Sequence, residues 1–103
     1  MLEVEKIRGQ TEVLNSAVLN IEGEIISNTG ISEKALKTIN FFWKKRDKVG
    51  ELFSLRGTKV MLVQIDLYYY VIAEDGSSIF CFVVDKHIAA TNLIKTLEKE
   101  LED

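Results

Sequence analysis

Apolar and polar residues recur along the first third of the chain with periods that predict a helix and then a hairpin. Between residues 2 and 14, apolar residues stand among charged ones in a short helical pattern, at Leu2, Val4, Ile7, Val13 and Leu14. Residues 16–21 and 24–27 are two apolar runs on either side of Glu22-Gly23. Two apolar runs around a glycine-containing break are typical of a β-hairpin.

The pattern then changes to a helical one, which predicts a long helix from Ser32 to about Phe53. Ser32 is a favourable N-cap, and Glu33 complements the helix dipole in the first turn. Apolar residues follow at intervals of three and four through most of this segment, at Ala35, Ile39, Phe42, Val49 and Phe53. Gly50 weakens the last turns, because glycine costs about 1 kcal/mol relative to alanine inside a helix.

The last part of the chain predicts three strands and a terminal helix. Residues 59–65, 67–73 and 79–84 are rich in β-branched and aromatic residues, and Asp66 and residues 74–77 separate them as turns. A terminal helix follows Asp85, with apolar residues at Ile88, Leu93, Ile94, Leu97 and Leu101.

These elements predict one α/β (α+β) domain over residues 1–103, with the order αββαβββα and a five-stranded antiparallel sheet. A chain of 103 residues fits one domain. Strands joined by tight turns are antiparallel neighbours. Residues 60–63 and 79–84 are apolar at consecutive positions, so both faces of the sheet should be covered. We expect the long helix on one face and the two terminal helices on the other.

Composition and charge exclude several classes of protein. Hydrophobic residues make up 47% of the chain and charged residues 28%, which is globular composition. The net charge of −3 argues against a nucleic-acid partner. No apolar run approaches the roughly 20 residues of a membrane span, and the first residues lack a signal-peptide pattern. We therefore expect a cytoplasmic protein without direct membrane insertion.

The residues that usually carry catalysis or bind metals do not form a recognisable site in the sequence. His87 is the only histidine and has no cysteine near it, so it is interpreted as a polar residue at the start of the last helix. Cys81 lies in an apolar strand and reads as a core thiol. Glu74 and Asp75 belong to a polar turn. We predict no enzymatic activity, no cofactor and no metal.

The predicted long helix carries two candidate interaction surfaces. Its apolar residues fall within an arc of about 80°, which Leu36 and Trp43 widen. This broad arc predicts a homodimer, with the strand over residues 59–65 as an uncovered edge beside it. The candidate interface residues are Leu36, Ile39, Trp43, Val60 and Leu62.

The second candidate surface lies on the opposite side of this helix. Phe41 and Leu52 fall within about 20° of one another there, among lysines of an otherwise acidic protein. We predict a partner-binding patch of Phe41, Leu52, Lys37, Lys45 and Lys48. Two alternatives are that lysine stems cover the apolar pair, or that Leu52 lies beyond the helix end. Arg46 falls inside the apolar arc, where the only role we can suggest is pairing across a dimer.

The order of elements and the hairpin over residues 17–27 resemble the roadblock/dynein light chain family. The hairpin is similar to that family's opening signature of apolar strand, acidic-glycine turn and apolar strand, and the meander ending in residues 79–85 before an amphipathic helix also matches. The resemblance covers about residues 12 to 101. It implies a homodimer whose long helices pack side by side and whose third strands pair. It also implies a non-enzymatic platform for a Ras-like small GTPase.

Three functions follow from the sequence. The leading one is a homodimeric regulator or scaffold of a Ras-like small GTPase, of the bacterial or archaeal regulator type. An arginine finger from Arg46 or Arg56 has no support in the sequence. The second is a structural subunit of a motor or membrane-associated complex without effect on nucleotide turnover. The third is a small-molecule sensor whose pocket Tyr68, Tyr69 and Tyr70 line, although alternate residues of a strand face opposite sides.

Overall fold

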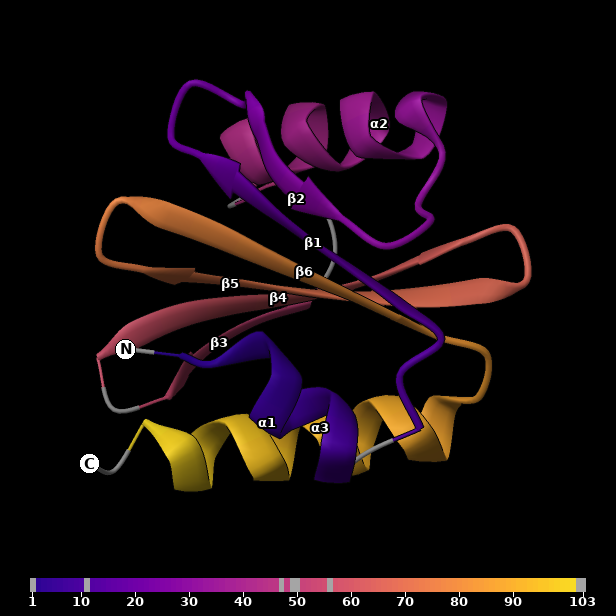
Figure 1. Cartoon of the computed structure of the whole chain (residues 1–103), viewed down its shortest axis with the longest axis vertical. Coiled ribbons are helices and arrows are strands. Elements are labelled where there is room, and N and C mark those ends of the chain that lie inside the picture. The colour runs from indigo at the N-terminus through magenta and orange to yellow at the C-terminus, as the bar shows by residue number, and fades with distance from the viewer. Residues whose placement is uncertain (1, 11, 47, 49–50, 56, 102–103) are drawn as a thin grey trace.

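The computed structural model describes residues 2–10, 12–46, 48, 51–55 and 57–101, which form three helices and six strands. In chain order these are α1 (Val4–Gln10), β1 (Asn15–Asn20), β2 (Ile25–Asn28), α2 (Glu33–Lys44), β3 (Glu51–Leu55), β4 (Thr58–Ile65), β5 (Tyr68–Asp75), β6 (Ser78–Val84) and α3 (His87–Glu100). The six strands form one sheet in the order β2-β1-β6-β5-β4-β3, and all neighbours are antiparallel. Figure 1 shows α2 on one face of this sheet and α1 with α3 on the other.

The turn residues explain how the hairpins close. Gly23, between β1 and β2, has a φ of 92°, a conformation that only glycine adopts readily. Asp66, between β4 and β5, has a φ of 56° and is one of the few other residue types that tolerate this region. The β1–β2 hairpin, the β4–β5 turn and the N-cap at Ser32, whose side chain accepts a hydrogen bond from the Ala35 amide at 3.1 Å, confirm the sequence predictions.

The structure corrects the predicted sheet and the predicted long helix. The sheet has six strands, not five, because residues 51–55 form β3 instead of the end of a helix. α2 ends at Lys44, and its last turn tightens as the Arg46 amide donates to the Trp43 carbonyl at 3.2 Å. The longest helix in the described part of the chain is α3, with 14 residues against 12 in α2. Val49, Gly50 and Arg56 lie outside the described residues.

The physical reason for the extra strand lies in its pairing with β4. Phe53 pairs with Val60 and packs against the cluster under α1 and α3, while Leu52 pairs with Met61 and faces α2. This alternation fits a strand between two covered faces. Pairing also satisfies the backbone groups along one edge of β4. β4 is therefore an internal strand, and the prediction that residues 59–65 form an open edge is wrong.

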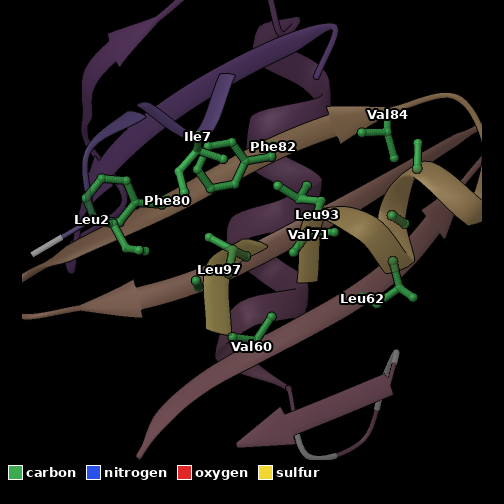
Figure 2. Packing of buried hydrophobic residues seen from close by; sticks show 13 residues of the cluster. Leu2, Ile7, Val60, Leu62, Val71, Phe80, Phe82, Val84, Leu93 and Leu97 are labelled. Carbon is green, nitrogen blue, oxygen red and sulfur yellow. The ribbon is translucent and has the colours of Figure 1, made fainter. Parts of the chain in front are cut away.

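Two clusters of buried apolar side chains hold the helices against the sheet. One lies under α1 and α3, where Ile7, Leu93 and Leu97 meet Phe82 and Val71 of the sheet, as Figure 2 shows. The other lies under α2 and includes Leu36, Ile39 and Trp43 packed on Met61 and Ile72. Each large side chain fully buried in this way contributes about 1.5–3 kcal/mol. Lys6 of α1 also pairs with Glu100 of α3, with 3.1 Å between Nζ and Oε2.

None of the helices in the described ranges is long and apolar enough to cross a membrane. The cytoplasmic location remains a prediction.

Candidate functional site

The five residues predicted for a dimer interface lie inside a single chain. Leu36, Ile39 and Trp43 are 3%, 0% and 4% exposed, and they pack on the sheet beneath α2. Val60 and Leu62 are buried on the opposite face of the sheet, under α1 and α3. These side chains fill the core, because a helix lying on a sheet turns its apolar arc inward. A second copy could not contact them without opening the core, so they do not form the predicted interface.

Phe41 lies on the outer surface of α2 and is 54% exposed. It stands two residues from Ile39, which is about 200° around a helix, so burial of Ile39 turns Phe41 outward. Its ring has Phe42 beside it, with 6.1 Å between centroids, and the Nζ of Lys45 lies 5.6 Å from its centroid. The ammonium lies within range of a cation–π contact and leaves most of the ring open to a partner.

The lysines near Phe41 make the outer face of α2 basic. Lys37 and Lys45 are exposed, as is Lys48, which follows the helix. Lys34 and Lys44 are exposed on the same helix, and Glu33 is its acidic residue. On a chain of net charge −3 this concentration of positive charge is local to α2. Such a face attracts an acidic partner over distances up to about 8 Å at physiological salt.

Leu52 does not share a helix with Phe41, which corrects the geometry of the predicted patch. It lies on β3, opposite Met61 of β4, and is 40% exposed. Met61 belongs to the cluster under α2, so Leu52 faces the α2 side of the sheet. The alternative in which Leu52 lies beyond the helix end is therefore the observed arrangement. Leu52 therefore lies on the sheet and not on the outer face of α2, where Phe41 and the lysines stand.

Arg46 packs against its own helix. Its Nη1 donates to the Trp43 carbonyl at 3.1 Å, and the guanidinium carbon lies 5.0 Å from the centroid of the Trp43 ring. Its Nε is enclosed without a hydrogen-bond partner. These contacts hold the side chain at the end of α2, where it does not project as an arginine finger would.

The three consecutive tyrosines divide between the two sides of the sheet. Tyr69 contacts His87 edge to face, with 5.5 Å between ring centroids. Tyr68 and Tyr70 lie on the α2 side and line a hollow of about 260 Å³ beside the start of that helix. The three tyrosines are pocket candidates in the sequence, but the hollow itself cannot be located there, because its other walls come from distant segments. The one signal in the sequence was the alternation of residues along β5, which places Tyr68 and Tyr70 on the same side of the sheet.

Cys81 is fully buried, and burial raises the pKa of its thiol far above the ordinary range, so the reactive thiolate is suppressed. Among residues 2–10, 12–46, 48, 51–55 and 57–101, no three His, Cys, Asp or Glu side chains gather where they could hold a metal ion.

Comparison with known proteins identifies the fold. No family model and no curated protein sequence matches the chain. Among solved structures, profilin Ib of Acanthamoeba castellanii is similar, with a TM-score of 0.56 over 87% of this chain and 85% of that one. The sequences are 14% identical, so the likeness concerns the fold alone. The chain is a single α+β domain with a profilin-like antiparallel sheet and helices.

Proposed function

We propose that the chain is a non-enzymatic protein-binding domain that regulates or scaffolds a Ras-like small GTPase through the outer face of α2. The observation that carries the proposal is Phe41, a large aromatic side chain left 54% exposed on a lysine-rich helix of an acidic protein. Interface hot spots are often aromatic side chains that become buried on binding. The partner class comes from the resemblance to the roadblock/dynein light chain family.

Charge supports a partner whose contact surface is acidic. Lys37 lies on the same helix as Phe41 and Lys45 caps the end of that helix, so an approaching carboxylate would meet them around the ring. Complementary charge at the rim of an interface mainly raises the association rate. An aromatic side chain that becomes buried on binding, with lysines around it, suits a reversible regulator.

The homodimer is part of the same proposal, but it requires a different surface from the one predicted. β4 is covered by β3, so the sheet ends at β2 and β3. A continuous sheet between two copies, as the resemblance implies, would have to form through one of these two edge strands. Light scattering at micromolar concentration should give the mass of two chains, and a monomer mass would contradict this part of the proposal.

The binding experiment measures the affinity of the chain for purified Ras-like GTPases in their GDP and GTP-analogue states. Phe41→Ala should weaken binding at least tenfold, which is about 1.4 kcal/mol, without changing the melting temperature or the mass in solution. Ile88→Ala is the matched control, because Ile88 is 68% exposed on α3, across the sheet from α2. A sharp fall in melting temperature or loss of the dimer would instead assign Phe41 to the core or the dimer interface.

GTP hydrolysis measured with the same GTPases separates regulation from scaffolding. A regulator should change the rate of single-turnover hydrolysis, and Phe41→Ala should abolish that change. A structural subunit of a motor or membrane-associated complex would bind without changing the rate. If none of the GTPases binds in either nucleotide state, the proposed partner class is wrong.

A further inference from the structure

The hollow next to the start of α2 has the features of a small-molecule site. It lies between the start of β1, the β2–α2 connection and the neighbouring ends of β5 and β6. Its apolar walls are Leu14, Ile31 and Val83, and its polar lining is Asn15, Ser32, Tyr68 and Tyr70, with Gly30 between them. The volume of about 260 Å³ equals roughly nine water molecules at about 30 Å³ each. This is room for one ring with a short substituent.

Tyr70 supplies a polar group that the protein itself does not satisfy. Its side chain is 7% exposed, yet its hydroxyl forms no hydrogen bond to any other described residue. Among the described residues, Nε of Arg46 is the one side-chain nitrogen or oxygen that is both shielded from solvent and without a hydrogen-bond partner. Because the Tyr70 hydroxyl also has no partner but is not shielded in this way, it is accessible to solvent. It therefore reaches the open space of the hollow that Tyr70 lines. An acceptor that enters the hollow would replace water at this hydroxyl, with a small net gain in free energy.

A second polar group stands at the rim of the hollow. The Oδ1 of Asn15 accepts a hydrogen bond from the Thr29 hydroxyl at 3.2 Å. That bond leaves the amide nitrogen of Asn15 as a donor without a partner among the described residues. A Cβ at position 30 would lie 2.6 Å from Oδ1 of Asn15, so glycine there lets the amide pack closely.

The charges around the hollow disfavour an anionic ligand. No lysine, arginine or histidine is among its lining residues. Burial raises the pKa of Tyr70, and the nearby Cys81, Asp66 and Tyr68 raise it further. The Tyr70 hydroxyl thus keeps its proton at neutral pH and remains a donor. The Asp66 carboxylate makes the surroundings unfavourable for a second anion.

We propose that this hollow binds a small uncharged ring compound that carries a carbonyl group, with the Tyr70 hydroxyl donating a hydrogen bond to the carbonyl oxygen. Leu14, Ile31 and Val83 contact the ring, and Tyr68, which is 44% exposed, covers it at the mouth. The site does not involve Phe41 or the lysines of α2, so it is independent of the proposed GTPase contact.

The test is a titration of the isotope-labelled full chain with benzamide, followed by amide chemical shifts. Saturable shifts are expected at Asn15, Gly30, Ile31 and Val83, with a dissociation constant in the millimolar range because the ligand has few atoms. Benzoate and toluene should bind at least fivefold more weakly, since one carries a charge and the other lacks the acceptor. Benzoate that binds as tightly as benzamide would overturn the argument from charge.

Matched tyrosine variants test the role of the hydroxyl. Tyr70→Phe keeps the ring and removes the hydroxyl, and it should weaken benzamide binding at least fivefold while leaving toluene unchanged. Tyr69→Phe makes the same change on the other side of the sheet and should have no effect. Tyr68→Ala, at an exposed position, should also weaken binding and provides a second test. Absence of saturable shifts, or equal binding by Tyr70→Phe and Tyr69→Phe, would overturn the proposal.

The two proposals fail separately in these experiments. Phe41→Ala should leave the benzamide shifts unchanged, and Tyr70→Phe should leave the affinity for the GTPase unchanged.

Discussion

Both faces of the sheet are lined by buried apolar side chains, yet the helices cover them differently. α1 and α3, of 7 and 14 residues, cover one face together and are linked by the Lys6–Glu100 ion pair. α2, of 12 residues, covers the other face alone. On that side the structure leaves the exposed ring of Phe41 and the hollow at Tyr68 and Tyr70. One face of the sheet thus serves mainly stability, while the other also carries the candidate binding features.

Within α2, the buried side chains stabilise the fold and the exposed ones are available for binding. Ile39 and Trp43 of α2 fix the helix to the sheet, and Phe41 between them points away. A side chain that contributes little to folding can be replaced without unfolding the domain. Variants on the two faces should therefore separate stability from binding.

The largest expected effect comes from the face under α1 and α3. Phe82 is fully buried there, and Phe82→Ala should lower the free energy of unfolding by about 3–5 kcal/mol because it leaves a cavity. Urea denaturation measures the loss. Under conditions where the variant is folded, its affinity for benzamide and for a GTPase partner should match that of the unaltered chain. A loss below about 1 kcal/mol, or weaker binding by the folded variant, would break the comparison between the faces.

An intermediate effect is expected where the β1–β2 hairpin meets α2. Gly23→Ala should lower stability by about 1–2 kcal/mol through backbone strain, because alanine disfavours a φ of 92°. It also places a Cβ 2.6 Å from the Nδ2 of Asn40. Gly57→Ala is the control, because Gly57 has a φ of 83° with nothing within 4 Å of the added carbon. Thermal or urea unfolding should show a larger loss at Gly23. Equal losses would mean that the Asn40 side chain moves away from the added carbon at no cost in stability.

The smallest effect on stability is expected on the outer surface of α2. Lys45→Glu with Lys48→Glu should change the free energy of unfolding by less than about 0.5 kcal/mol but slow association with an acidic GTPase partner several-fold. The penalty should shrink as salt rises, because exposed charges are screened. Stopped-flow mixing at several salt concentrations measures it.

The control for this pair is Lys95→Glu with Lys99→Glu on α3, which lowers the net charge by the same amount at exposed positions across the sheet. If both pairs slow association equally, total charge and not the α2 surface governs the encounter. That result would remove the electrostatic distinction between the two faces.

The local features of the chain could be predicted from the sequence because they depend on neighbouring residues. Ser32 caps α2 through its own side chain, and Gly23 permits a φ that other residues avoid. Both signals can be recognised from a few consecutive residues. The hairpins and α3 have periods long and regular enough to identify the element. The outward position of Phe41 also follows from helical spacing once Ile39 is assigned to the core.

Only the tertiary structure decided the features that depend on pairing and packing between distant segments. The apolar residues near Phe53 fit a helical spacing, but pairing with β4 and packing on the cluster under α1 and α3 make this segment a strand. That strand turns β4 from an edge into an internal strand and places Leu52 on the sheet instead of on the helix that carries Phe41. The hollow at Tyr70 likewise needs walls from β1, β5, β6 and the start of α2. Periodicity describes one segment at a time, whereas strand partners and cavity walls are set by which segments meet.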